Sequence, residues 1–82
     1  MSYVLTEHAR DALRKRQIEV AWMEQALNAP EVTETDPVDP ALEHRLARIS
    51  EFRDRVLRVI INAKRTPSHV VTVFFDRRRI IP

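Results

Sequence analysis

The 82-residue sequence contains no glycine and no cysteine. Without glycine the chain lacks the glycine-rich loops that hold the phosphates of nucleotides and dinucleotides, so no cofactor site of that kind is expected. Without cysteine, disulfide bonds and thiolate chemistry are excluded. No apolar run approaches the length that spans a bilayer, and charged residues begin at Glu7, so neither a membrane span nor a signal peptide is expected. These absences predict a cytoplasmic protein without a cofactor.

The chain is long enough for one small domain with one core, and its net charge of +2 is divided unevenly. Residues 1–43 carry nine acidic and four basic residues, a charge of −5, whereas residues 44–82 carry three acidic and ten basic residues, a charge of +7. A basic half of this kind is typical of a surface that meets a polyanion. The alternative is that the two halves attract each other within the fold.

Residues 55–76, RVLRVIINAKRTPSHVVTVFFD, are the centre of the predicted fold. They read as two strands rich in β-branched and aromatic residues, joined by a polar connector over 64–68 in which Pro67 suits a turn. Both strands are apolar on both faces, which is typical of the middle of a sheet with at least one face covered. We therefore expect a central hairpin.

Two helical segments precede this hairpin. Thr6 is the expected N-cap of the first helix, which reaches Arg16. Its apolar face consists of Ala9, Ala12 and Leu13. A second helix over about 19–28 ends at Pro30. Its apolar stripe consists of Val20, Met23, Ala26 and Leu27. The short link between the helices predicts a pair lying on one face of the sheet.

Three further segments are candidates for strands. Residues 3–5 are either a short strand or the lead into the first helix, and residues 32–36 carry acids at the spacing of an edge strand. Residues 44–50 favour a strand, although residues 40–50 also match a helical period, and both interpretations stay open. The predicted fold is α+β in one domain over 1–82. Two N-terminal helices pack on one face of a 3–4-stranded antiparallel sheet.

Metal binding and covalent catalysis have little support in the sequence. The three histidines, His8, His44 and His69, form no motif of metal ligands, so no metal site is predicted. The serines lack a nucleophile motif. His8 has two interpretations. It is either a half-buried side chain bonded to a carbonyl or carboxylate, or an acid, base or phosphate contact beside the arginines.

Basic side chains are the remaining candidates for chemistry. Arg58 lies on a central strand among apolar residues, where a charge must be paired or face water. Lys64 and Arg65 lie at one end of the hairpin, and residues 77–79 follow its second strand. Such groups bind phosphates, and they stabilise the charge that develops when RNA is cleaved by its own 2′-hydroxyl without a metal. Alternatively, they keep the sheet soluble and pair with the acidic front half.

Several short motifs resemble a bacterial domain of unknown function. In the front half these are the stretches TEHA at 6–9, RQIE at 16–19 and ALNAP at 26–30. The closing hairpin, RVLRV at 55–59 and VVTVFFDRR at 70–78, matches more closely. That family is similar to the RelE/ParE and BrnT-like toxin group. The resemblance implies two helices on a curved antiparallel sheet. It also implies the activities of that group, which are mRNA cleavage on the ribosome or action on gyrase, with antitoxins covering the active surface.

Two functional hypotheses follow. The first is a RelE/BrnT-like toxin-type domain that binds RNA, alone or on the ribosome, cleaves it without a metal and has an antitoxin-like partner. Its candidate catalytic residues are His8, Arg58 and Arg77, and its candidate nucleic-acid-binding residues are Arg45, Arg48, Lys64, Arg65, Arg78 and Arg79. The second is a non-catalytic protein-interaction module, forming a homodimer through residues 32–36 or the Ile80-Ile81 tail.

Overall fold

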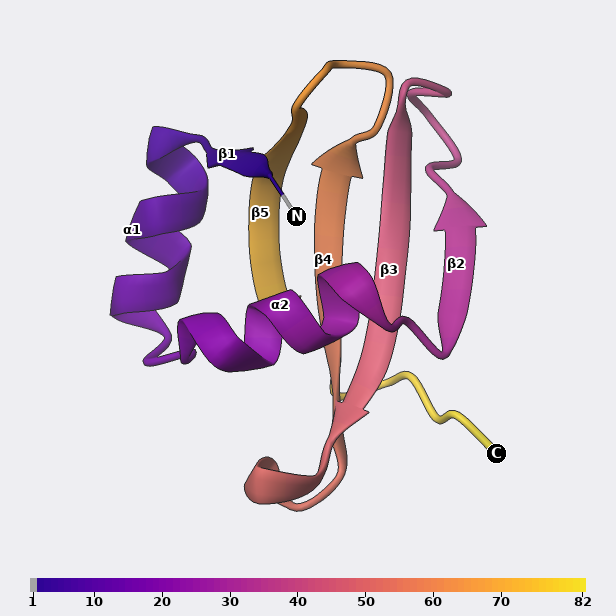
Figure 1. Cartoon of the computed structure of the whole chain (residues 1–82). Coiled ribbons are helices and arrows are strands. Elements are labelled where there is room, and N and C mark those ends of the chain that lie inside the picture. The colour runs from indigo at the N-terminus through magenta and orange to yellow at the C-terminus, as the bar shows by residue number, and fades with distance from the viewer. Residues whose placement is uncertain (1) are drawn as a thin grey trace.

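The computed structural model describes residues 2–82. It is an α+β domain in which two helices precede most of a five-stranded sheet (Figure 1). Its elements in chain order are β1 (Tyr3–Leu5), α1 (Glu7–Lys15), α2 (Val20–Asn28), β2 (Val32–Thr35), β3 (Leu42–Ile49), the 3₁₀ helix η1 (Ser50–Phe52), β4 (Arg55–Asn62) and β5 (Ser68–Phe75). Both α-helices are nine residues long, too short to cross a bilayer.

The strand order of the sheet is β1-β5-β4-β3-β2. The central hairpin, β4 with β5, and the strand at 42–49 confirm the predicted pairs, and β2 is the expected edge strand. The prediction of three or four antiparallel strands is wrong, because β1 adds a fifth strand that runs parallel to β5. A three-residue strand carries too little pattern to name its partner, which here lies more than sixty residues away in sequence, at 68–70.

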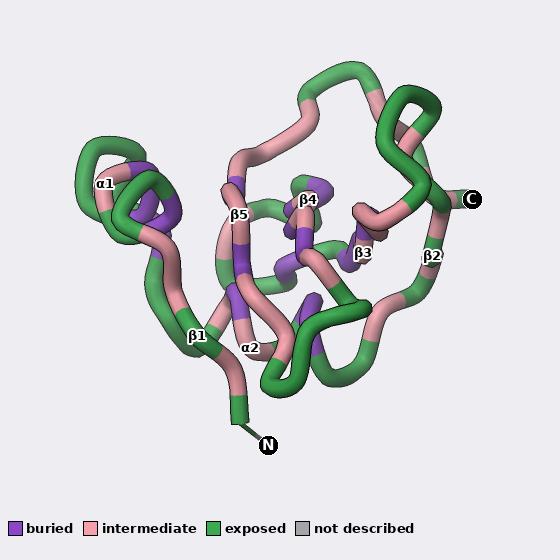
Figure 2. Tube along the Cα trace, turned by 90° about the horizontal axis from the view of Figure 1, so that it is seen from above, coloured by how far each residue is buried: buried purple, intermediate pink, exposed green. Residues whose placement is uncertain are grey.

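The helices begin and end where the local chemistry predicts. The Thr6 side chain accepts a hydrogen bond from the Ala9 backbone N–H at 3.1 Å, which caps α1. After α1, the N–H of Ile18 donates to the carbonyl of Leu13 at 2.9 Å, and Gln17 adopts a left-handed conformation with φ 53°. This turn sends α2 back across the same face of the sheet, and Figure 2 shows buried residues on the sides of both helices that meet the strands.

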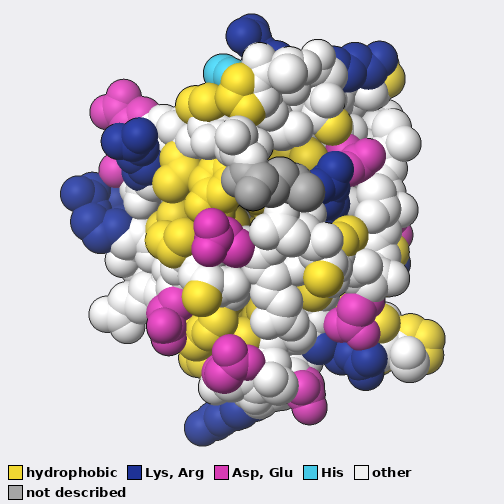
Figure 3. All heavy atoms as spheres, viewed as in Figure 1, with side chains coloured by type: hydrophobic (Ala, Val, Ile, Leu, Met, Phe, Trp, Pro, Cys, Tyr) yellow, Lys and Arg dark blue, Asp and Glu magenta, His cyan; other side chains and the backbone are white. Residues whose placement is uncertain are grey.

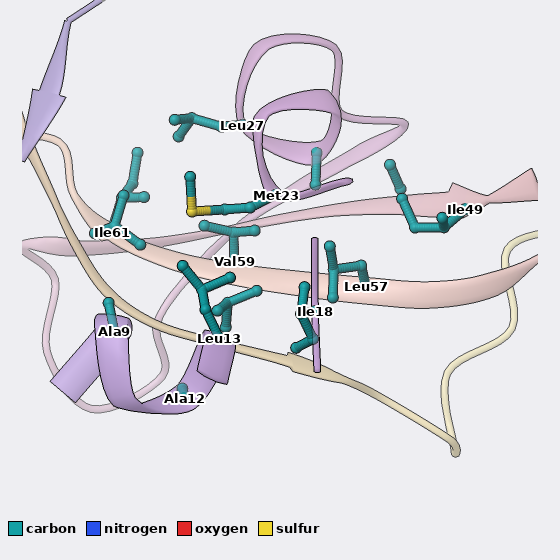
Figure 4. Packing of buried hydrophobic residues seen from close by; sticks show 14 residues of the cluster. Ala9, Ala12, Leu13, Ile18, Met23, Leu27, Ile49, Leu57, Val59 and Ile61 are labelled. Atoms are coloured by element: carbon teal, nitrogen blue, oxygen red, sulfur yellow. The ribbon is translucent and has the colours of Figure 1, made fainter. Parts of the chain in front are cut away.

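The main core lies between this helical pair and strands β3, β4 and β5 (Figure 4). Its helical members include Ala9, Leu13, Ile18, Met23 and Leu27, and its strand members include Ala47, Ile49, Leu57, Val59, Ile61, Val70 and Val73. Val20, predicted for the apolar stripe of α2, is instead 46% exposed, because it occupies the first turn of the helix, away from the sheet.

The opposite face of the sheet, here called the helix-free face, is covered differently. Leu46 is fully buried there although it lies outside the main core, and Arg58 is its partner on β4. The C-terminal segment 77–82 runs from the end of β5 toward the side of the sheet that carries β2 (Figure 1). Arg79 of this segment contacts Glu34 of β2, its guanidinium Nη2 lying 2.7 Å from the carboxylate. Polar contacts rather than a second pair of helices therefore close this face.

Candidate functional site

Four of the predicted site residues form ion pairs within the molecule. The guanidinium of Arg48 meets Glu31 at 2.6 Å, and that of Arg79 meets Glu34 at 2.7 Å. Arg45 lies on the helix-covered face, where it pairs with Glu43 at 2.7 Å and donates to the carbonyl of Leu27. The fourth, Arg58, pairs with Asp76 at 2.7 Å. The first three pairs join the basic half to carboxylates of the acidic front half. Asp76 lies in the basic half itself, but Arg58 also meets the front-half Glu34 at 3.6 Å, so for all four arginines the two halves attract each other within the fold.

The remaining predicted residues do not lie together. Lys64 and Arg65 are exposed in the connector between β4 and β5, whereas Arg77 and Arg78 lie at the opposite end of β5. Eight strand residues separate the two groups by roughly 25 Å. His8 is exposed on α1 and lines a hollow of about 190 Å³ with Asp11, Lys15 and Arg16. On the helix-bearing side, acidic and basic side chains are interspersed around the rim (Figure 3).

Arg58 belongs to a hydrogen-bonded network on the helix-free face. Its Nε and Nη2 atoms both donate to Asp76 Oδ2, at 3.1 and 2.7 Å, and its Nη1 lies 2.8 Å from Nδ1 of His44. The Arg58 side chain is only 13% exposed. Because a buried guanidinium is costly unless its donors are satisfied, the three bonds explain how a charge is tolerated on the central strand.

The network also determines which ring nitrogen of His44 carries the proton. His44 is 9% exposed. Arginine only donates, so Nδ1 of His44 must accept from Arg58, and the ring proton lies on Nε2. Nε2 then donates to Asp36 Oδ1 at 2.6 Å. Backbone N–H groups of Asp39 and Val38, together with His44, hold the pKa of Asp36 below its usual value, so this carboxylate remains an acceptor.

Asp76 connects this network to the end of β5. The guanidinium of Arg58 lowers the pKa of Asp76, and the backbone N–H of Arg78 donates to its Oδ1 at 3.1 Å. The backbone N–H of Asp76 donates to the carbonyl of Val56 at 2.9 Å. The chain therefore leaves the sheet in a defined turn, and Arg77 extends from that turn.

A cleft of about 420 Å³ opens at this end of the sheet, and we call it the basic cleft. It is lined by Arg53, Asp54, Arg55, Asp76, Arg77 and Arg79. Two of its members are already paired, Asp76 with Arg58 and Arg79 with Glu34. Arg53 and Asp54 hold consecutive left-handed conformations, with φ 59° and 56°, which form the tight turn into β4. The cleft thus lies between this turn and the end of β5.

A second hollow of about 270 Å³, here called the aromatic pocket, shares two arginines with the basic cleft. It is lined by Arg16, Phe52, Arg55, Phe75 and Arg77. The rings of Phe52 and Phe75 stack with centroids 4.7 Å apart, and the Arg55 guanidinium lies 5.2 Å from the Phe52 ring centroid. Trp22 of α2 packs against both rings.

Most arginines of the two hollows have no carboxylate partner in the described part of the chain. Four of them form no ion pair with any carboxylate in residues 2–82, namely Arg16, Arg53, Arg55 and Arg77. Only Arg77 was a predicted site residue. The others come from the helix link and from the turn before β4, so nothing in their local sequence indicated that they meet. The buried His44 was missed for the same reason, since its two partners, Asp36 and Arg58, come from two other segments.

Comparisons with known proteins give one positive result. No match was found among the curated proteins or among the solved structures. The model of one family, described as a domain of unknown function (DUF4258), matches residues 5–75, which include both helices and the whole of β2 to β5. The chain therefore belongs to the DUF4258 family.

Proposed function

We propose that this domain binds RNA through the basic cleft and the aromatic pocket beside it. The observation that carries the proposal is the convergence of four arginines without carboxylate partners at one end of the sheet. Guanidinium groups bind phosphate oxygens in bidentate fashion, and an arginine already paired inside the protein has few donors left for a ligand. The four arginines without carboxylate partners, not the paired ones, are therefore the phosphate contacts of the proposal.

The proposal includes a relationship in fold to the RelE/BrnT-like toxin group and a cytoplasmic location. The helical pair on one face of the sheet supports the relationship in fold. The motifs on which this relationship rests also predicted a domain of unknown function, and the family model that matches the chain is of that kind. RNA on the ribosome and an antitoxin-like protein covering the cleft are the partners that such a relationship implies. An acidic segment in that partner would compete with RNA for Arg55 and Arg77.

Binding is tested by fluorescence anisotropy with a labelled RNA of about ten nucleotides in about 50 mM salt. If roughly three arginines contact phosphates, the logarithm of the binding constant should fall with the logarithm of salt with a slope of about −2. Arg77→Ala should weaken binding and reduce that slope by about 0.7.

The matched control is Arg65→Ala, which removes an exposed cation at the opposite end of the sheet. It should leave both the affinity and the salt slope unchanged. Equal losses in the two variants would contradict a defined cleft. Equally tight binding of DNA of the same sequence, or of an acidic peptide of matched charge, would overturn the assignment to RNA.

The stronger form of the proposal is metal-independent cleavage. Arg77 at the cleft would stabilise the charge on the phosphate attacked by a 2′-hydroxyl. Arg58 bonds to Asp76, which holds the turn at the end of β5 from which Arg77 extends. His8 lines the hollow next to Arg16. Labelled RNA incubated with the protein and EDTA, with and without ribosomes, should be shortened by the wild type and not by Arg77→Ala. Intact RNA in every case removes the enzymatic claim and leaves the binding claim to the anisotropy assay.

A non-catalytic interaction module is the second candidate. Two exposed apolar side chains favour it, Ile80 at 81% and Val38 at 89% exposure, together with the edge strand β2. This candidate predicts a stable homodimer or complex formed through residues 32–36 or through the Ile80-Ile81 tail. Light scattering during size-exclusion chromatography measures the mass directly, and Ile80→Asp should dissociate such a dimer. A monomer at every concentration would contradict the homodimer.

A further inference from the structure

We propose that the aromatic pocket receives one unpaired base of the bound RNA, which makes single-stranded RNA the ligand of this domain. The inference rests on the proposed function and adds the form of the ligand and the side chains that contact its base. Three features carry it, namely the aromatic pair, the charge of the pocket and the two arginines that the pocket shares with the basic cleft.

The aromatic pair supplies the apolar surface. Phe52 and Phe75 stack on each other and both line the pocket, although each ring is only partly buried. Trp22 supports the pair from α2, with its ring centroid 5.5 Å from that of Phe52 and 6.1 Å from that of Phe75. Partly exposed rings packed against a third aromatic side chain provide the stacking surface that proteins use for the bases of single-stranded RNA.

The charge of the pocket matches a nucleotide. Arg16, Arg55 and Arg77 line it, and no carboxylate among residues 2–82 does. The planar guanidinium of Arg55, 5.2 Å from the Phe52 ring centroid, provides a second surface on which a base can stack. An acidic protein segment would find the same charges but would leave the aromatic surface unused, so the pocket favours a ligand that carries both a ring and a negative charge.

The shared arginines set the geometry of the ligand. Arg55 and Arg77 line both hollows, so a phosphate held between them in the basic cleft is adjacent to the aromatic pocket. A base and its own phosphate have this relation within one nucleotide. In a duplex the bases are stacked and paired inside the helix, and only an unpaired base can turn into a pocket at the side of the backbone.

The first experiment compares three RNAs of equal length with the wild-type protein by anisotropy. These are a single strand, the corresponding duplex and a strand that carries no bases. Stacking of one base predicts that the single strand binds about tenfold more tightly than either of the others. Equal binding of the single strand and the strand without bases overturns the inference while leaving RNA binding in place. Absence of binding by all three RNAs overturns the proposed function as well.

The second experiment uses a matched pair of variants. Phe52→Leu removes the ring and should lower the affinity for the single strand about tenfold, to that of the strand without bases. Phe52→Tyr keeps the ring and should retain the wild-type affinity. Unchanged binding by a folded Phe52→Leu protein overturns the inference. Circular dichroism establishes the fold of each variant, and the comparison of the three RNAs decides the question if Phe52→Leu does not fold.

Trp22 gives a readout that does not depend on a variant. It is the only tryptophan of the chain, and it contacts both rings that line the pocket. Saturating single-stranded RNA should therefore change its fluorescence, whereas a saturating strand without bases should not. The same change with both ligands would contradict entry of a base into the pocket.

Discussion

At the scale of single residues, the absence of glycine has a structural consequence at three positions. Gln17, Arg53 and Asp54 all adopt left-handed backbone conformations, which glycine adopts at much lower cost. Gln17 follows the end of α1 in a turn closed by bonds from Ile18 to Leu13 and from Gln17 to Arg14. Arg53 and Asp54 form the turn that places Arg53 and Arg55 at the basic cleft. Strain is therefore stored both at a structural turn and beside the candidate site.

The first prediction concerns Gln17→Gly. Glycine at this position should raise the free energy of unfolding by about 1 kcal/mol, because it removes the steric cost of the left-handed conformation. Urea-induced unfolding followed by circular dichroism measures the change. The control is Gln17→Ala, which keeps the β-carbon and should give no gain. Equal stabilities of the glycine and alanine variants would contradict the explanation.

The second prediction concerns Arg58→Met, a change that keeps the length of the apolar stem. Without the guanidinium, Asp76 loses both of its charged donors and His44 loses the donor to Nδ1. Removing one partner of a mostly buried ion pair leaves an uncompensated charge, so we expect a loss of about 3 kcal/mol in the free energy of unfolding. Arg48→Met, which breaks the solvent-exposed pair with Glu31, should cost clearly less. Similar losses of unfolding free energy in the two variants would show that burial of the ion pair does not determine the cost of breaking it.

At the scale of elements, Thr6 joins the edge of the sheet to the first helix. Its hydroxyl lies 2.9 Å from the Val70 carbonyl and accepts the N–H of Ala9, and its own backbone N–H donates to Val70. One residue thus ends β1, begins α1 and attaches both to β5. This arrangement explains how a strand of three residues can hold a parallel position in the sheet.

The third prediction follows from this junction. Thr6→Ala should lower the free energy of unfolding by about 1–2 kcal/mol, because the helix loses its cap and the hydroxyl no longer bonds to β5. Hydrogen exchange should show that amides of β1 and of the first turn of α1 exchange faster, while those of β3 and β4 change less. Thr6→Ser keeps the hydroxyl and should remain close to the wild type. A serine variant as unstable as the alanine variant would indicate that the methyl group, not the cap, matters.

At the scale of the whole molecule, charge takes the place of apolar packing on one face of the sheet. The helix-covered face is closed by a continuous core, whereas the helix-free face is held by contacts that connect β2, β3, β4 and the C-terminal segment. The pKa of Asp36 is lowered by the Asp39 and Val38 N–H groups and by His44, that of Glu34 by Arg79, and that of Asp76 by Arg58. The stability of this face therefore depends on ionised carboxylates.

The fourth prediction is a loss of stability in acid. These carboxyl groups bind protons more weakly in the folded chain than in the unfolded chain, so their contribution is fully present above their ordinary pKa of about 4. It should be lost progressively as the pH falls below that value. Thermal unfolding between about pH 7 and pH 2 measures the loss. Asp76→Asn, which has no proton to gain, should start less stable and decline less steeply, and a parallel decline would contradict the assignment to Asp76.

Patterns within single segments were enough to predict most of the elements. The alternation of apolar residues over 55–62 and 68–75 indicated the hairpin, the 3.6-residue period of Ala9, Ala12 and Leu13 indicated α1, and Thr6 and Pro30 marked helix ends. These signals are local, because periodicity and capping depend on residues within a few positions of one another. For the same reason, the β1 strand at 3–5 carried no information about its partner.

What the sequence by itself determined is therefore the kind and order of the elements from α1 to β5, the helical pair on one face of the sheet and the unequal charge of the two halves. Only the tertiary structure decided which arginines are free. Arg58 and Arg79 meet carboxylates from distant segments, whereas Arg16, Arg55 and Arg77 line one hollow with two phenylalanines. The availability of a charge depends on which groups the fold brings within a few ångströms of it, and Coulomb interactions at that range are set by distance in space, not by position in the chain.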